Sequence, residues 1–512
     1  MAYPIDSEEG GLRPERSQAR QFVAMLVIGV ATALVLGVTV RSPTQLEAND
    51  ISRWCTVWSL LERGTYAIDE SPWQARTQDK VRKADKLAEP GNGASALTRF
   101  EYAIAPRSWK TGPVTERFYS SKPPLLPTVI AGALYPFRKA TGVPLEKEVL
   151  TDRSPRYVQK IDPANPSRFT YVLETPKDKI KWPVYVFYFK PIVILLNVLP
   201  MFVFLILYSR FLDRYAVNDW SWMASLFAAA FGTLLFAFDQ TLNNHTVAAY
   251  SAFFALYPFL KIWDDDSPTR ANFLAAGFFA AFTACNELPA ALFGLLLFLV
   301  LLARWPGKTL KYFVPAAVIP CLAFLITQYA AMGQFKPAYE DFGTKAYEYE
   351  GSYWTTPLEF DYFNKAPESK SVYLLHMLIG HHGVFSLTPI ALFAIIGAFR
   401  AMRRESKGLA ATAALTLVLT IAMVAFYDWN PKARNYGGST QGLRWLFWLI
   451  PFWMITLPPG LEPGQDRRVY RWLSLIALMV SVFSVGYAIR HPWSHPWIVD
   501  LMEQLGLYSL KR

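Results

Sequence analysis

Three charged side chains of this 512-residue chain stand beside long apolar segments, where an ion is costly unless it has a function or a partner. Asp50 opens the stretch Ala48–Asp69, Lys122 precedes two prolines at the head of an apolar run, and Arg444 follows the glycines of NYGGSTQG. Ammonium and guanidinium groups bind phosphate oxygens, and a carboxylate accepts protons. The cations therefore favour a phosphate site at the membrane surface, and a catalytic Asp50 would need such partners.

Each of the three residues also has a structural explanation. Asp50 suits a helix N-cap, because aspartate accepts hydrogen bonds from the first free amides of a helix. Lys122 could mark the level of the lipid headgroups by snorkelling, and Arg444 could anchor the outer end of an apolar helix beside several tryptophans. The sequence leaves both interpretations of each residue open.

An amphipathic helix is predicted over Ala48–Asp69. Trp54 and Trp58 belong to an apolar stripe with three- and four-residue spacings, and Arg53 lies off that stripe. Such a helix lies in the membrane interface, with the tryptophans as anchors. Asn49 and Arg53 flank Asp50 along this helix and are candidate residues of the same cavity.

Further polar side chains interrupt the apolar segments. Asp239 and His245 fall between two apolar runs, and Glu287 lies in the corner NELP. Ionisable residues at such depth suggest a functional site, although capping explains Asp239 as well. The histidine pair of HMLIGHHG has no acidic ligand at a familiar spacing, so a zinc site is not predicted. The three cysteines are too scattered for a disulfide framework or a metal cluster.

The composition indicates an all-α polytopic membrane protein. Hydrophobic residues make up 53% of the chain and charged residues only 18%, with a mean hydropathy of +0.18. The net charge of +11 comes from basic residues in short loops, so it indicates membrane topology and not nucleic-acid binding. The first apolar run, Phe22–Val40, is long enough to be a retained membrane helix.

Eleven crossings are predicted. They lie near 22–40, 185–207, 221–238, 246–262, 271–303 (two short helices meeting at NELP), 312–332, 384–399, 409–427, 443–457 and 471–489. The run 124–137 is short, and we interpret it as re-entrant. A tilted crossing there, giving about twelve helices, is the alternative and would invert the later loops.

The positive-inside rule then orients the chain. Alternate loops carry Arg210 and Arg214, Arg270, Arg304 with Lys308, Arg400 with Arg404, and Arg467 with Arg471. We therefore expect a cytoplasmic tail at 1–21, a catalytic transmembrane module at 22–332 with an extracytoplasmic loop at 41–123, an outer loop or lid at 333–383, and a C-terminal transmembrane module at 384–512 with an extracytoplasmic tail. Within the first loop, the charged insert 74–95 is predicted to be an exposed loop.

The order of these features resembles the GT-C superfamily of membrane glycosyltransferases. The shared features are an acidic residue soon after the first helix, the ending RGTYAID of the interfacial helix, and the KPP turn. Lipid A aminoarabinose transferases and protein O-mannosyltransferases are closest in pattern. The resemblance implies transfer of a sugar from a polyprenyl phosphate on the extracytoplasmic side of the cell (inner) membrane.

Carried over by position, the resemblance gives roles to three residues. Asp50 corresponds to the acidic residue that acts as base or binds the acceptor, and Lys122 to the lysine near the lipid phosphate. Arg444 corresponds to the arginine of a late GG…GxR stretch in bacterial relatives. The corners that hold Asp239, His245 and Glu287 tend to face the cavity. Two departures are Ser121, where an acidic residue usually precedes KPP, and the long interval between Asp50 and Lys122.

The expected activity is therefore inverting glycosyl transfer from a polyprenyl-phosphate-linked sugar to an extracytoplasmic lipid, glycan or protein. No nucleotide cofactor is expected, and dependence on a divalent metal stays open. A ligase or polymerase with a diphosphate-linked donor is the alternative within this class. A non-enzymatic transporter or scaffold is the alternative outside it.

Overall fold

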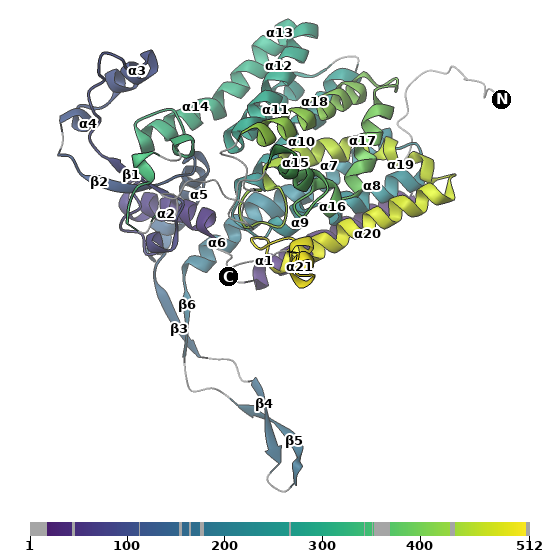
Figure 1. Cartoon of the computed structure of the whole chain (residues 1–512), viewed down its shortest axis with the longest axis horizontal. Helices are drawn as coiled ribbons and strands as arrows, with labels where there is room; N and C mark the ends of the chain where they lie inside the picture. Colours follow the sequence, from purple (N-terminus) through teal and green to yellow (C-terminus); the bar gives the residue numbers. More distant parts are fainter. Residues whose placement is uncertain are drawn as a thin grey trace.

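Long apolar helices form most of the body of the molecule (Figure 1). The computed structural model describes residues 18–42, 47–111, 113–152, 156–162, 165–174, 179–265, 268–341, 344–350, 352, 369–430 and 436–507. The predicted tail 1–21 lies largely outside the described residues, and so does a large part of the predicted lid 333–383.

Six helical segments in the described residues are long and apolar enough to cross a membrane. They are α1 (Gln18–Arg41); Tyr185–Tyr215, made of α6 (Tyr185–Val193), η2 (Ile194–Val198) and α7 (Leu199–Tyr215); Asp219–Phe238, with α8 (Asp219–Phe231) and α9 (Leu235–Phe238); Pro306–Met332, with α13 (Pro306–Lys308), η4 (Thr309–Phe313) and α14 (Val314–Met332); α18 (Lys407–Trp429); and α20 (Arg468–Arg490). The chain is thus a helical, polytopic membrane protein, as predicted.

Other helices complete the bundle. They are α10 (Asn244–Asp264), α11 (Arg270–Asn286), η3 (Leu288–Ala290), α12 (Ala291–Arg304), α15 (Lys370–Leu378), α16 (Val384–Leu387), α17 (Ile390–Ala401), η9 (Arg444–Leu449), α19 (Ile450–Leu461), η10 (Glu462–Gly464) and α21 (Trp497–Gln504). The predicted corner at NELP is confirmed, since α11 ends at Asn286 and the next helix begins at Leu288, with Pro289 in its first turn. Glu287 is left in the bend between them.

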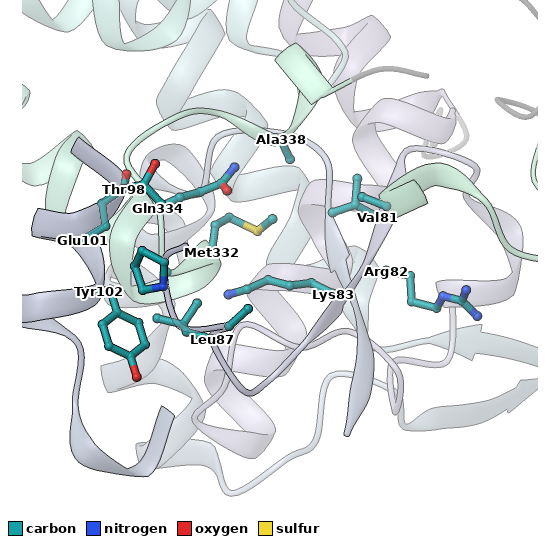
Figure 2. Close-up of a pocket in the computed structure, with 14 residues that line it drawn as sticks. Val81, Arg82, Lys83, Leu87, Thr98, Glu101, Tyr102, Met332, Gln334 and Ala338 are labelled. Carbon is teal, nitrogen blue, oxygen red and sulfur yellow. The ribbon is translucent and has the colours of Figure 1, made fainter. Parts of the chain in front are cut away.

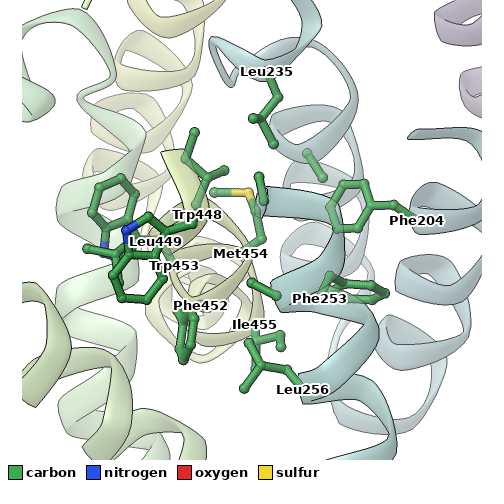
Figure 3. Close-up of a cluster of buried hydrophobic side chains, with 14 of the residues drawn as sticks. Phe204, Leu235, Phe253, Leu256, Trp448, Leu449, Phe452, Trp453, Met454 and Ile455 are labelled. Carbon is green, nitrogen blue, oxygen red and sulfur yellow. The ribbon is translucent and has the colours of Figure 1, made fainter. Parts of the chain in front are cut away.

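Aromatic and small residues pack the core of the bundle. Phe204 and Phe253 meet edge to face with their ring centroids 4.7 Å apart, and Trp448 is fully buried (Figure 3). α17 and α19 approach so closely that a Cβ at Gly397 would lie 1.8 Å from the Thr456 carbonyl oxygen. Small residues allow such backbone contact between membrane helices.

The loops predicted to be cytoplasmic meet at one end of the bundle. Arg20 Nη2 lies 2.6 Å from Asp219 Oδ1, Asn218 donates to the Glu462 carbonyl at 3.2 Å, and Arg404 pairs with Glu462. Ser406 in turn donates to Asp264 Oδ2 at 2.7 Å. These contacts place four of the predicted loops side by side, as alternating topology requires.

The predicted first outer loop folds into short elements at the other side of the bundle. These are α2 (Ala48–Arg63), η1 (Gln74–Arg76), β1 (Lys80–Ala84), α3 (Ala96–Ile104), α4 (Arg107–Thr111), β2 (Glu116–Ser120) and α5 (Leu125–Thr141). β1 pairs antiparallel with β2, and α5 packs against α2. The prediction of an exposed loop at 74–95 is therefore wrong for the part around Asp79 and Val81, because both residues are buried.

The helix predicted at 48–69 is real but shorter and more buried than expected. It ends at Gly64, whose φ of 66° closes the last turn. Ser52 and Arg53, which lie off the apolar stripe, are buried as well, because polar partners from later segments cover them. α2 thus has two buried faces, and a one-sided interfacial helix is not what the structure shows.

A β-sheet arm extends from the bundle (Figure 1). β3 (Glu148–Asp152) pairs with β6 (Lys179–Pro183), and β4 (Arg156–Asp162) pairs with β5 (Asn165–Glu174). Both pairs are antiparallel. The sequence analysis did not predict these strands. Two further 3-10 turns, η5 (Ala338–Asp341) and η6 (Lys345–Tyr347), follow α14.

Candidate active site

Asp50 lies in the first turn of α2 with its side chain completely buried. The N-cap of this helix is Glu47, and both carboxylate oxygens of Asp50 lack a hydrogen bond. The N-cap interpretation of Asp50 is therefore wrong. A buried carboxylate without a donor is costly, so its oxygens are available to a hydroxyl group from outside the chain.

Arg444 lies at the start of η9 and is also buried. Its Nε and Nη1 atoms lack hydrogen bonds, and its guanidinium carbon lies 4.8 Å from the centre of the Trp493 ring. Gly437, with a φ of 87°, passes so close that a Cβ there would lie 3.3 Å from Arg444 Nε. Gly437 of NYGGSTQG thus makes room for a guanidinium that still has N–H groups to donate.

Lys122 follows directly after β2 and faces a carboxylate that the sequence analysis missed. Its Nζ lies 3.2 Å from Asp79 Oδ1, and both side chains are largely buried. The β1–β2 pairing creates this contact, since the Ser121 amide donates to the Asp79 carbonyl at 3.0 Å. Ser52 fixes the same corner to α2 by donating to the Asp79 carbonyl at 2.5 Å.

Asp79 supplies a carboxylate beside Lys122 that the sequence analysis did not predict. It lies 43 residues before Lys122 in the sequence, so spacing around KPP gives no sign of it. The only signal is the alternation in KVRKA, which has a partner strand in ERFYS. Recognising that hairpin across a long insertion would have been necessary to find Asp79.

A polar chain links α2 to the NELP corner. Arg53 Nη2 donates to Asn244 Oδ1 at 2.5 Å, and Asn244 Nδ2 donates to Glu287 Oε1 at 2.7 Å. The same carboxylate oxygen contacts His245 Nδ1. Arg53 also donates to the Asn49 carbonyl at 3.3 Å, which is the one contact that Asn49 contributes here. The structure thus brings Arg53, His245 and Glu287 together.

The charges of these residues act on one another, so the residues lie near one another in the fold. Burial raises the pKa of the Asp50 carboxyl well above its ordinary value, and Arg53 and Arg444 oppose this rise. Burial lowers the pKa of Lys122, and Asp79 opposes it. The pKa of Glu287 rises to about 8 because of burial, against the influence of Arg444, Arg53 and Lys122.

Asp239 does not join this cluster in the described contacts. The Tyr250 hydroxyl donates to the carboxylate of Asp239, 2.9 Å from Oδ1 and 2.8 Å from Oδ2. The side-chain amide of Asn197 donates to the backbone carbonyl of Asp239 at 3.1 Å. These bonds satisfy the group within the bundle core. Of the predicted cavity residues, Asp239 is therefore the one whose contacts indicate a structural role.

The arrangement can bind an anion and accept a proton at adjacent positions. Arg444 offers free N–H groups, Lys122 adds a second cation, and Asp50 offers a free carboxylate. In the described residues, no group of three or more His, Cys, Asp and Glu side chains is placed to hold a metal ion. Neither protein-family models nor curated proteins match this sequence.

Proposed function

We propose that this chain transfers a sugar from a polyprenyl phosphate carrier to a hydroxyl group of an extracytoplasmic acceptor. The observation that carries the proposal is the presence of a buried carboxylate and a buried guanidinium, both with unfilled hydrogen bonds, in one cluster. The GT-C-like order of Asp50, RGTYAID and KPP supports the same conclusion. The proposal also includes eleven crossings, a cytoplasmic N-terminus and a site on the outer face of the cell membrane.

In the proposed reaction, Arg444 and Lys122 hold the lipid phosphate. Asp50 accepts the proton of the acceptor hydroxyl as the oxygen attacks the anomeric carbon. The bond between that carbon and the phosphate oxygen breaks, and the electron pair leaves with the phosphate. The two cations stabilise the charge that develops on this leaving group, and the configuration at the anomeric carbon inverts.

Arg53 and Glu287 have supporting roles in this proposal. Arg53 opposes the rise in the pKa of Asp50 and so favours the ionised base, while its bond to Asn244 fixes the guanidinium. Glu287 orients His245 and Asn244 from the corner between α11 and η3. Neither residue needs to touch the substrate for these effects.

Native mass spectrometry of the detergent-purified protein tests the proposal. The wild-type chain should carry a polyprenyl phosphate or its glycosylated form, and Arg444→Ala and Lys122→Ala should lose it. Asp50→Asn should retain the glycosylated donor, because its cations are intact and transfer is blocked. Lys308→Ala, at the opposite end of the bundle, is the matched control.

The mass of the adduct also separates the alternatives. If the bound adduct is a diphosphate-linked oligosaccharide, the chain is a ligase or polymerase and not the proposed transferase. A chain that binds no isoprenoid lipid in any variant would contradict both enzymes and favour a transporter or scaffold.

A further inference from the structure

A pocket lined in part by β1, the strand that follows Asp79, contains none of the candidate active-site residues (Figure 2). Its volume is about 200 Å³, and its walls come from β1, α3 and the turn that follows α14. Val81 and Lys83 line it from β1, and Met332 and Gly333 line it from the end of α14. The proposed transfer reaction uses none of these residues.

Lys83 is the unusual group in this pocket. Its side chain reaches between Met332 and Leu87, and its Nζ lies 5.8 Å from the ring centre of Trp109 and 5.6 Å from that of Tyr119 (Figure 2). Among the described residues it forms no ion pair, because the nearby Asp85 is bound by Arg117 at 3.1 Å and by the Tyr119 hydroxyl at 2.9 Å. Burial lowers the pKa of this ammonium to about 8.

The backbone leaves space for the Lys83 ammonium. A Cβ at Gly333 would lie 3.1 Å from Lys83 Nζ and 3.1 Å from a methyl group of Leu87. The one carboxylate in the pocket wall, Glu101, already accepts the Phe335 amide at 2.7 Å and holds the turn that closes the pocket. A half-buried cation whose nearby carboxylate is already bound by other side chains favours an anionic ligand.

The helix α3 indicates what kind of molecule carries that anion. Thr98, Glu101 and Tyr102 on one face of α3 line the pocket. Leu97, Phe100 and Ile104 on the opposite face are each about half exposed, at 52%, 54% and 46%. An amphipathic helix with such a face lies against lipid. Seven basic and four acidic residues between positions 82 and 117 add attraction for negative charge.

We propose that this pocket binds the phosphate or carboxylate headgroup of an anionic lipid, with Lys83 as its counter-ion and the exposed face of α3 against its apolar chain. Four residues of extended chain, about 13 Å, separate Lys83 from Asp79. A lipid held there therefore lies about this distance along the chain from the Lys122–Asp79 pair. Identifying this lipid as the sugar acceptor rests on the proposed function, whereas its binding does not.

Amine labelling of the purified full-length chain measures occupancy of the pocket directly. Near pH 8, an amine-reactive acetyl ester acetylates Lys83, and peptide mass spectrometry gives its rate. Octyl phosphate should slow this rate about tenfold, as the loss of a charge-assisted contact would imply. Exposed Lys86 is the internal control and should be labelled at the same rate throughout.

Three comparisons make the outcome decisive. Inorganic phosphate and octyl glucoside should protect Lys83 much less than octyl phosphate does, since each lacks one half of the ligand. Equal protection by either compound, or none by octyl phosphate, would overturn the proposal. Lys122→Ala should leave the protection of Lys83 intact. The test of this pocket therefore does not depend on whether the transferase proposal is correct. In a Lys122→Ala, Arg444→Ala background, which removes the cations of the proposed donor site, calorimetric binding of octyl phosphate should persist with Lys83→Arg and disappear with Lys83→Gln.

Discussion

At the scale of single residues, the candidate site is distinguished by buried polar groups that lack hydrogen-bond partners. The Asp50 carboxylate and the Arg444 guanidinium are both buried, and both retain polar atoms without partners. A chain under selection for stability alone would fill or remove such groups, because each costs free energy of folding. Their presence in one cluster is best explained by a ligand that supplies the missing partners.

Asp50→Asn should separate activity from stability. Removing the base should lower the rate of sugar transfer at least about 10²-fold. The midpoint of thermal unfolding should stay the same or rise, because a buried carboxylate without a donor is replaced by a neutral group. A transfer assay and a fluorescence melting curve measure the two effects. If Asp50→Asn instead loses much thermal stability but keeps its activity per folded molecule, Asp50 is not the base.

The pH dependence of transfer should follow Asp50. A base must be ionised, and burial raises the pKa of Asp50, so the rate should fall on the acidic side at a pH well above that of an exposed aspartate. Arg53 is the strongest influence that lowers this pKa. In Arg53→Gln the acidic limb should therefore move to higher pH. A limb that stays in place in this variant would show that another group is the base.

At the scale of elements, short irregular segments place the charged groups. The β1–β2 pairing brings Asp79 to Lys122, the NELP bend brings Glu287 to His245, and the glycine turn before η9 leaves space for the buried guanidinium of Arg444. None of these segments is a membrane-spanning helix. The long helices form the scaffold, and the short segments between them position the charged side chains of the candidate site.

The two neighbouring glycines of the turn provide a matched pair of variants. Gly437 and Gly438 have φ angles of 87° and 78°, so alanine at either position costs roughly 1–2 kcal/mol of backbone strain. Only a Cβ at Gly437 meets Arg444, whereas the one at Gly438 meets open space. Gly437→Ala should therefore weaken donor binding, measured by native mass spectrometry, while Gly438→Ala should not. Equal effects on binding would remove the assigned role of Arg444.

Glu287 should make stability depend on pH. Its pKa rises from 4.5 to about 8 on folding, so between these values the folded chain holds a proton that the unfolded chain has lost. Stability from this group is present below about pH 4.5 and falls as the pH rises to about 8, by up to about 1.4 kcal/mol per unit. The melting midpoint of Glu287→Gln should fall less between pH 6 and 8.5 than that of the wild type. Parallel curves would contradict the raised pKa.

At the scale of the whole molecule, the bundle separates two ends. Ion pairs such as Arg20 with Asp219 connect the predicted cytoplasmic loops, and the candidate site lies among the elements of the predicted outer loops. Close helix contacts hold these ends at a fixed distance. The two proposed anion sites therefore lie on one side of the bundle.

Gly397 tests how much this frame depends on close packing. A Cβ there would lie 1.8 Å from the Thr456 carbonyl, so Gly397→Ala should force α17 and α19 apart and lower the melting midpoint and the yield of folded protein. Gly486, inside α20, faces open space. Gly486→Ala should be neutral or stabilising by up to about 1 kcal/mol, because alanine favours the helix. Similar melting midpoints for both variants would contradict the tight contact.

The sequence by itself determined the membrane class, most helical segments and the NELP corner, because long apolar runs and proline act locally. It also indicated Asp50, Lys122 and Arg444, because ions beside apolar runs stand out in any sequence. Only the tertiary structure decided that Asp239 is satisfied by Tyr250, that Asp79 accompanies Lys122, and that Arg444 lies near enough to Asp50 and Lys122 for its charge to shift their pKa values. The physical reason is that hydrogen bonds and charges act through space, whereas residues such as Asp79 and Lys122 become neighbours only after β1 and β2 have paired.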